Sequence, residues 1–193
     1  MTTRSTAHPI DPIFLDRWSP RAFDGSVMPE ADLLTMLDAA RWAASSFNYQ
    51  PWRFLYALRG TPDFDRFLNL LMPFNAAWAK AASALLIVVS DREMVMGDKS
   101  NPSHSHSFDA GAAWAQLALQ ATRMGYHTHG MAGVDFDRAR TELSVPDRFR
   151  LEAAIAVGRI GDPATLPDKL REREFPSDRK PLDEIAYPGN FRA

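Results

Sequence analysis

Two short fragments near the N-terminus concentrate side chains that can bind a polar ligand. Residues 17–23, Arg-Trp-Ser-Pro-Arg-Ala-Phe, place the guanidiniums of Arg17 and Arg21 on either side of the Ser19 hydroxyl. A phosphate carries about −1.5 to −2 charge near pH 7, so this set suits its acceptor oxygens. Residues 44–52, Ala-Ser-Ser-Phe-Asn-Tyr-Gln-Pro-Trp, supply hydrogen-bonding side chains at nearly every second position. The first fragment therefore suits a phosphate and the second a flat polar ring.

Each fragment also has an ordinary structural explanation. Two arginines four residues apart are typical of a solvated helical face, whose charges contribute little to stability. A run of Ser and Asn is typical of a helix cap or of a turn before a strand. The sequence contains no Gly-x-Gly-x-x-Gly or P-loop motif that would bind a phosphate instead. The ligand-binding interpretation therefore depends on what accompanies the two fragments.

The composition indicates one domain of residues 1–193. A chain of 193 residues can bury roughly 70% of its unfolded surface. The net charge of −2 gives no field that favours nucleic acid or an anionic membrane. The absence of cysteine excludes disulfides and thiolate sites and fits a reducing compartment, so we expect the cytoplasm. The apolar run at 84–89 is far too short to span a bilayer, which predicts a soluble protein.

Hydrophobic periodicity predicts helices and strands that alternate irregularly along the chain. The predicted helices cover residues 29–44, 64–71, 75–82, 108–124 and 135–143, and the predicted strands cover 53–58, 84–89, 126–129 and 153–157. The helix at 108–124 is apolar almost all round and rich in Ala and Gly, which suits either a domain core or a subunit interface. Residues 162–193 are rich in proline and charge, so we expect an extended C-terminal arm along the surface or over a partner subunit.

Four fragments taken together resemble the flavin-dependent nitroreductase family. They are residues 17–23, residues 44–52, the turn Gly-Met-Ala-Gly-Val-Asp at 130–135 and the closing Arg-Lys-Pro-Leu-Asp-Glu-Ile at 179–185. The resemblance covers the chain from about Asp11 to Ile185. It implies an α+β fold with a mixed central sheet flanked by helices, an intertwined homodimer, and one FMN at each of two sites shared between the subunits.

The resemblance also assigns cofactor-binding residues. The fragment that contacts the ribityl chain and phosphate of FMN corresponds to Arg17, Trp18, Ser19 and Arg21, and Arg179 corresponds to a third phosphate-facing basic residue. The loop that reaches the flavin from the neighbouring subunit corresponds to Ser45, Ser46, Asn48 and Gln50. Side-chain amides both donate and accept hydrogen bonds, so Asn48 and Gln50 suit the pyrimidine edge of the ring.

Two further matches concern the ring itself. The turn that crosses the ring toward N5 corresponds to Met131, Ala132 and Gly133, and a backbone N–H there can donate to N5 whatever the side chain. Asn75 matches an asparagine that approaches the flavin in many relatives. An ordinary strand-to-helix turn and a helix cap are the structural alternatives at these two places.

Departures from the family pattern indicate where the substrate pocket differs. Ala44 replaces the usual proline, and Phe47 stands where many relatives have a small or polar residue. Trp78 lies where some relatives have lysine and others tryptophan, with core packing as its alternative. A cation or donor stabilises the charge of the reduced ring, so Lys80 or a backbone amide would have to replace that lysine. We expect Phe47 and Trp78 to shape the substrate pocket.

Four of the five histidines form two His-x-His pairs, His104 with His106 and His127 with His129. Alternate residues of a strand share a face, so either pair is compatible with a metal site. The first pair lies in the polar stretch 101–107, which predicts a mobile loop that gates the substrate. Substrate contact or proton donation by His104 and His106, a structural metal and plain surface roles all remain open.

The sequence thus predicts an FMN-dependent oxidoreductase. The resemblance implies that hydride passes from NADH or NADPH to flavin N5 and then, in a ping-pong sequence, to a nitroaromatic, a quinone or a similar small acceptor. The flavin carries the redox chemistry, so no side chain is required as a nucleophile and no metal is required. A non-catalytic flavin-binding protein of the same fold and a histidine-dependent metalloenzyme are the two alternatives.

Overall fold

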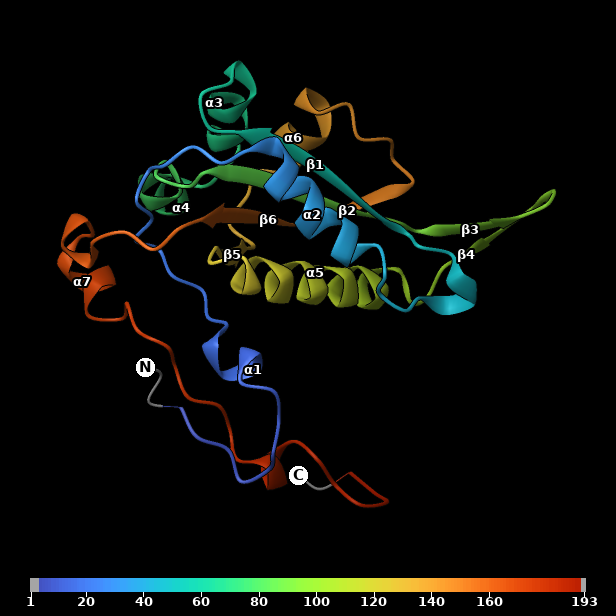
Figure 1. The fold of residues 1–193 in the computed structure, drawn as a ribbon. Helices are drawn as coiled ribbons and strands as arrows, with labels where there is room; N and C mark the ends of the chain where they lie inside the picture. Colours follow the sequence, from blue (N-terminus) through green and yellow to red (C-terminus); the bar gives the residue numbers. More distant parts are fainter. Residues whose placement is uncertain (1–3, 192–193) are drawn as a thin grey trace.

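The computed structural model describes residues 4–191, in which helices cover both faces of a four-stranded sheet (Figure 1). The strands lie in the order β1-β2-β6-β5. Their bounds are β1 Trp52–Leu58, β2 Ala84–Asp91, β5 His127–Met131 and β6 Phe149–Gly158. The α+β class is confirmed, but all three pairings are antiparallel, so this sheet is not the mixed one expected. Each strand pairs only with antiparallel neighbours, and β1 and β5 are the two edge strands of the sheet.

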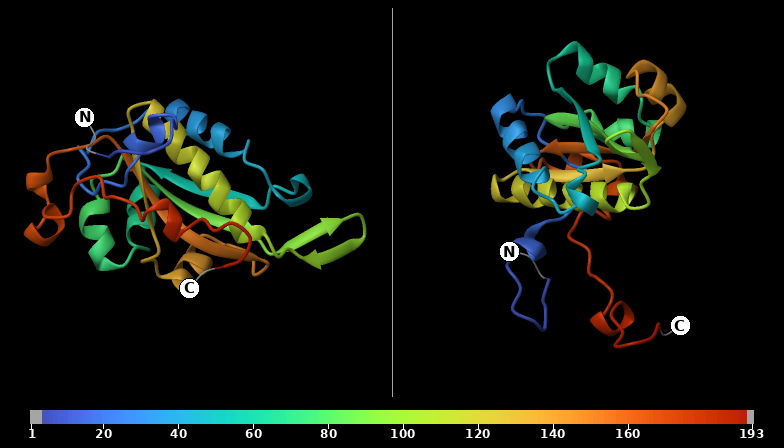
Figure 2. Two further views of the ribbon diagram at one scale, coloured as in Figure 1. Left: turned by 90° about the horizontal axis from the view of Figure 1, so that it is seen from below. Right: turned by 90° about the vertical axis from the view of Figure 1, so that its right-hand side faces the viewer.

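The helices divide between the two faces of the sheet (Figure 2). Two of them, α2 Glu30–Ala40 and α5 His106–Arg123, pack together on one face. The opposite face is covered by α3 Pro62–Leu68, α4 Pro73–Ala79 and α6 Phe136–Glu142. Proline opens α3 and α4, where its missing N–H costs nothing. The short elements are α1 Ile13–Asp16, α7 Asp168–Arg171 and the 3-10 turns η1 Ser46–Asn48, η2 Pro163–Thr165 and η3 Leu182–Glu184.

The buried core follows from the alternation of side chains along β2. Every residue of this strand is buried, as an apolar run covered on both faces requires. Leu85 and Ile87 point into the cluster under α3, α4 and α6. Leu86 and Val88 point the other way, toward α2 and α5. The sheet therefore fixes where α5 and the turn after β5 lie.

A projecting hairpin, β3 Glu93–Met96 and β4 Lys99–Pro102, was not predicted from the sequence. Gly97 allows its tight turn, with φ of 60°. Residues 101 and 102 are consequently in a strand, and α5 begins at His106. The prediction of a loop over 101–107 is therefore wrong for most of that stretch.

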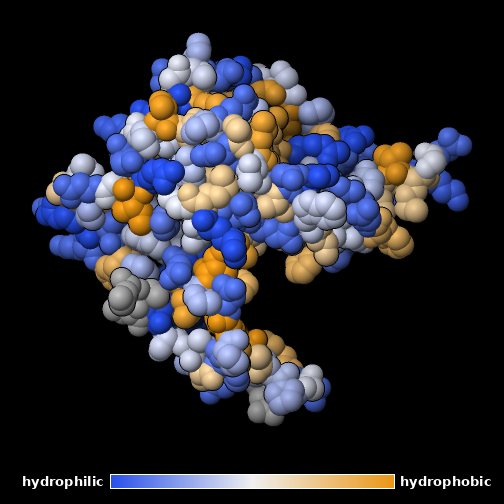
Figure 3. Space-filling view, in the orientation of Figure 1, coloured by the Kyte–Doolittle hydropathy of each residue, from blue (hydrophilic) through white to orange (hydrophobic). Residues whose placement is uncertain are grey.

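The two ends of the chain leave the body together. The segment after α7 runs beside the N-terminal residues in Figure 1, and Arg4 Nε donates to Ser177 O at 2.9 Å. In the space-filling view this arm projects below the body and leaves a hollow beside it (Figure 3). No helix within residues 4–191 is both long and apolar enough to cross a membrane.

Candidate functional site

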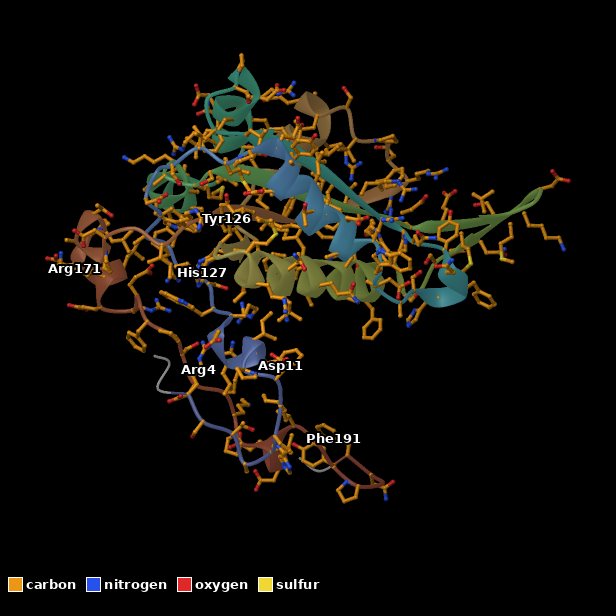
Figure 4. All side chains as sticks on the ribbon, viewed as in Figure 1. Arg4, Asp11, Tyr126, His127, Arg171 and Phe191 are labelled. Atoms are coloured by element: carbon orange, nitrogen blue, oxygen red, sulfur yellow. The ribbon has the colours of Figure 1, made fainter. Side chains whose placement is uncertain are left out.

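Five arginines surround one cavity of about 300 Å³, which we call the anion pocket. It brings together the predicted residues Arg17, Trp18, Ser19, Arg21 and Arg179. The other lining residues are Arg4, His129, Arg173, Phe175 and Ser177. Both ends of the chain contribute, and Arg4 lies where they run side by side (Figure 4). The structure thus gathers the basic residues of the two fragments around one cavity, while their contact with a phosphate stays a prediction.

Hydrogen bonds to backbone groups hold residues 17–23 against β5 and the chain that follows β6. Helix α1 ends at Asp16, and Arg17 continues the chain in an extended conformation. His129 Nδ1 lies 2.9 Å from Pro20 O, and since a carbonyl only accepts, this nitrogen carries the hydrogen. Gly161 N donates to Ala22 O at 2.8 Å, next to the bridge between Phe23 and the residue before that glycine.

The arginines of the anion pocket repel one another. The pKa of Arg17 is lowered by burial and then by the charges of Arg179 and Arg4. Burial and Arg179 lower the pKa of Arg4 in the same way. Arg4 Nη1 donates to Leu15 O and Arg17 O at 3.0 and 2.9 Å, which fixes its guanidinium beside the pocket. Such an excess of partly desolvated positive charge fits a dianionic phosphate.

Arg21 differs from Arg17 because a buried carboxylate answers its charge. Arg21 Nη1 lies 3.8 Å from Glu174 Oε2. Glu174 Oε1 also accepts from the backbone N–H groups of Arg21 and Ala22, at 2.6 and 2.8 Å. Arg17 is therefore the arginine of this fragment that most needs an anion.

The anion pocket opens into a groove along α5. This second cavity, of about 440 Å³, shares Arg17 and Ser19 with the pocket. Its other walls are Phe14, Trp114, Ala115, Ala118, Leu119 and Gly130. A Cβ added at Gly130 would meet the Trp114 ring at 3.4 Å, so glycine keeps this wall flat. A pocket for an anion that continues into a largely apolar groove suits a phosphate carried by a flat ring.

The structure also brings Asn75 to the turn after β5. Gly133 O accepts from Asn75 Nδ2 at 3.2 Å and from Met72 N at 3.0 Å. Met131 is buried, Gly133 is half-buried and Ala132 is exposed. The two predicted groups of ring-contacting residues therefore meet, although their contact with a flavin stays a prediction.

Trp78 occupies the core position that its packing alternative predicted. Its side chain is 3% exposed and its ring centroid lies 4.7 Å from that of His129 and 6.3 Å from that of Phe23. Its Nε1 is buried and has no hydrogen-bond partner among residues 4–191. Trp78 thus packs against His129, which lines the anion pocket, and its predicted contact with substrate is not tested. Lys80 is exposed at the end of α4.

The loop at 45–50 holds unusual backbone conformations. Phe47, Asn48 and Gln50 all have positive φ, at 51°, 52° and 53°. Such conformations cost about 1–3 kcal/mol each for residues other than glycine, and they cluster at functional sites. Ser45 Oγ accepts from Gln50 N at 3.0 Å, which closes the loop on itself, while the side chain of Phe47 is 81% exposed.

A buried carboxylate attaches this loop to the beginning of α5, away from the anion pocket. Asp109 Oδ2 accepts from Ser46 N at 3.2 Å and from Ser105 Oγ at 2.9 Å. The groove contacts α5 from Trp114 as far along as Leu119, which is about 15 Å beyond Asp109 at 1.5 Å per residue. In Figure 1 the loop lies beside the β3–β4 hairpin and not beside α1. One chain therefore does not bring the two predicted halves of the cofactor site together.

The four paired histidines lie in separate surroundings, and the predicted contact of His104 and His106 with substrate stays a prediction. His106 is held at the start of α5, where its Nδ1 lies 2.7 Å from Ser90 Oγ, and His104 is exposed in the preceding turn. His127 packs edge-on against Trp18 at 6.2 Å. The pKa of His127 is lowered by burial and then by Arg17, and that of His129 mainly by burial. Within residues 4–191 no group of three or more His, Asp or Glu residues could hold a metal.

Several residues of the anion pocket carry no recognisable signal in the sequence. They are Arg4, Arg173 and Ser177, with Glu174 beside them, whereas His129 was noticed only as half of a His-x-His pair. They come from separate segments that only the folded chain brings together, so no spacing along the sequence could identify them.

Comparisons with known proteins agree with this geometry. A family model described as "Nitroreductase family" matches residues 15–72 and 62–159. A solved structure described as an oxidoreductase containing FMN is 52% identical, has a TM-score of 0.97 and is aligned over 100% of this chain and 98% of its own. The NADH dehydrogenase of Thermus thermophilus is 26% identical, over 89% of this chain and 91% of its own. An uncharacterised 15.4 kDa protein of Mycolicibacterium smegmatis is 37% identical, over 66% of this chain and 84% of its own.

Proposed function

Because this chain belongs to the nitroreductase family, and is thus an oxidoreductase, we propose that it is an FMN-dependent enzyme that oxidises NADH or NADPH. The electrons pass to a nitroaromatic, a quinone or a similar small acceptor. The cysteine-free sequence supports a reducing compartment, and the cytoplasm is our proposed location.

The observation that carries this proposal is the anion pocket with its attached groove. Arg17, Ser19 and Arg179 line one cavity, which supports their role in binding the FMN phosphate, and Arg4 adds a guanidinium that the family fragment does not contain. Burial and then the charges of Arg179 and Arg4 lower the pKa of Arg17, and a bound phosphate would offset both effects. The fit of the pocket to a dianion thus follows from the charges of the residues themselves.

The groove supports the position of the ring. Bound FMN supplies hydride transfer at N5, first from the nicotinamide and then to the acceptor. Gly130 leaves a flat wall beside Trp114, and Asn75 holds the turn at Gly133 through its carbonyl. The chain's own contribution is to orient the ring and its two successive partners and to keep them apart from water.

We further propose a homodimer in which the loop at 45–50 of one subunit completes the site of the other. The separation of this loop from the anion pocket within one chain supports that arrangement. Phe47 of the loop and Phe108 of α5 are 81% and 82% exposed, and a partner subunit would cover such apolar side chains. The projecting arm carries further exposed apolar side chains, at Phe175, Leu182, Ile185 and Phe191.

The visible spectrum of the purified protein tests the function. We expect a yellow protein whose flavin absorbance bleaches when NADH or NADPH is added under argon, and returns when a quinone or nitroaromatic is added. A yellow protein that never bleaches would indicate the non-catalytic alternative, and a colourless protein with stoichiometric zinc would indicate the metalloenzyme. Light scattering tests the assembly, because a monomer at micromolar concentration is incompatible with a site shared between subunits.

A further inference from the structure

Four hydrogen-bonded side chains from three elements meet beside the groove, and we call them the Glu152 cluster. They are Ser90 of β2, His106 and Ser107 of α5 and Glu152 of β6. Ser107 Oγ donates to Glu152 Oε1 at 2.7 Å, and Ser90 Oγ donates to the same oxygen. His106 Nδ1 lies 2.7 Å from Ser90 Oγ and 3.6 Å from Glu152 Oε1. The side chains of His106 and Glu152 are only 15% and 16% exposed, so the cluster is shielded from bulk water.

A β-bulge directs Glu152 toward this cluster. Val88 pairs with Ala153 and Val89 pairs with Leu151, so Glu152 is the extra residue on β6. A bulge re-aims the side chain of the extra residue and is common beside active sites. The regular alternation of the strand is thus interrupted at Glu152, whose carboxylate meets Ser107 of α5.

The cluster opens into a cavity that continues the groove. This cavity, of about 190 Å³, shares Trp114 and Gly130 with the groove. Glu152 and Ser107 are its polar lining, and the rest of the wall is Val88, Ala110, Gly111, Ala153 and Ile155. Glu152 also borders the cavity at Ala132, on the other side of the turn after β5. A ligand that reaches this end of the groove therefore meets a carboxylate and a hydroxyl.

The hydrogen bonds of the cluster have a direction. Because the Ser90 hydroxyl donates to Glu152, its oxygen accepts from His106, so the neutral imidazole carries its hydrogen on Nδ1. When His106 is doubly protonated, its Nδ1 proton can pass to Ser90 while Ser90 passes its own proton to Glu152. The cluster is thus arranged as a short proton relay.

Other charged groups near the relay are already engaged. Arg150 Nε lies 3.5 Å from Glu152 Oε2 from an exposed position on the same strand. Asp91 of β2 is bound to Arg148, and Asp109 of α5 accepts from Ser105 and Ser46 as described. Glu152 is therefore the carboxylate that lies next to His106 at the start of α5.

Building on the proposed function, we propose that Glu152 donates a proton to the acceptor during its reduction and that His106 re-protonates Glu152 through Ser90. A quinone that receives a hydride gains two electrons and one hydrogen, and it needs one more proton on oxygen. The new O–H bond forms as the Glu152 O–H bond breaks. Glu152 regains a proton from Ser90, Ser90 from His106 Nδ1, and His106 from water. General-acid catalysis of this kind contributes typically 10²- to 10⁴-fold.

Two acceptors separate proton donation from electron transfer. Benzoquinone takes up protons, whereas ferricyanide takes up electrons alone. In stopped-flow measurements on the reduced holoenzyme, we expect Glu152→Gln to slow reoxidation by benzoquinone about 100-fold and to leave reoxidation by ferricyanide unchanged. His106→Gln should slow only the benzoquinone reaction and remove its dependence on pH. Glu142→Gln, which changes a carboxylate of α6 in the same way, is the matched control and should behave as wild type.

The apoprotein gives a readout that does not depend on activity. Nitrogen-15 NMR of labelled histidine should show His106 as the Nδ1–H tautomer in wild type, and Ser90→Ala should disturb that preference. If Glu152→Gln does not fold, Ser90→Ala interrupts the same relay and should still slow benzoquinone selectively. Equal rates with benzoquinone for variant and wild type, equal slowing with both acceptors, or an Nε2–H tautomer would each overturn the relay. A wild-type protein without FMN, or one that NADH and NADPH fail to reduce, would instead refute the proposed function.

Discussion

Arg17 and Arg21 are predicted to respond in opposite ways to replacement by alanine. Arg17 is surrounded by other cations, whereas Arg21 partners the buried Glu174. A hydrogen bond to a charged group contributes about 1.5–3 kcal/mol, so Arg17→Ala should weaken FMN binding roughly 10- to 150-fold. Arg17→Ala should change the free energy of unfolding of the apoprotein by no more than about 0.5 kcal/mol, because the folded protein disfavours the charge of Arg17.

Arg21→Ala should mainly destabilise the fold. It leaves Glu174 Oε2 buried without a cation, which costs about 1–3 kcal/mol. The assays are titration of each apoprotein with FMN, followed by quenching of flavin fluorescence, and urea unfolding of the apoproteins. Arg123→Ala, at an exposed arginine in the last turn of α5, is the matched control.

The two variants are compared by their affinity for FMN and by the stability of their apoproteins. Arg17→Ala that binds FMN as tightly as wild type would show that the anion pocket is not the phosphate site. Arg17→Ala that destabilises the apoprotein more than Arg21→Ala would refute the account of their charges.

Three further outcomes follow from the structure. Phe47→Gly should stabilise the apoprotein by about 1 kcal/mol in urea unfolding, because glycine adopts positive φ without strain, while a less stable variant would argue against that strain. Gly161→Ala should lower the thermal midpoint, since its Cβ would lie 2.4 Å from the backbone oxygen of Phe23 and overpacking costs about 1–3 kcal/mol. The pKa values of His127 and His129 are lowered on folding, so the native state binds fewer protons than the unfolded chain as the pH falls below about 6.5. The free energy of unfolding should therefore be highest above that pH and fall below it, by at most about 1.4 kcal/mol per pH unit for each histidine. Urea unfolding between about pH 7 and pH 5 measures this dependence, and replacing both histidines by Gln should make it weaker.

The central strands and helices were predictable because the pattern of apolar residues, proline and glycine within each segment indicates its structure and burial. The apolar run at 84–89 could only be a strand covered on both faces, and it is the core of β2. Proline and glycine marked the ends of the helices, and the helix predicted at 108–124 corresponds to α5. The fragment at 17–23 was identified because its charges are close together in the sequence.

The remaining features depend on contacts between distant residues. The β3–β4 hairpin is mostly exposed, so it has no apolar pattern that distinguishes it from a loop. The role of Glu174 beside Arg21 becomes visible only when the C-terminal segment is folded back. Glu152 looks like an ordinary strand residue until the pairing with β2 shows that one residue is left over.

The two ends of the chain that line the anion pocket also determine when it can form. Arg21 and its partner Glu174 are 153 positions apart. A ribosome that adds about 5–20 residues per second needs roughly 8–30 s to synthesise the intervening chain. The sheet, α2 and α5 can emerge and pack during that interval, while the basic residues at 17–21 wait for their C-terminal neighbours. The pocket is therefore among the last parts of the protein to assemble, and its ligand is acquired after translation of this region and not during it.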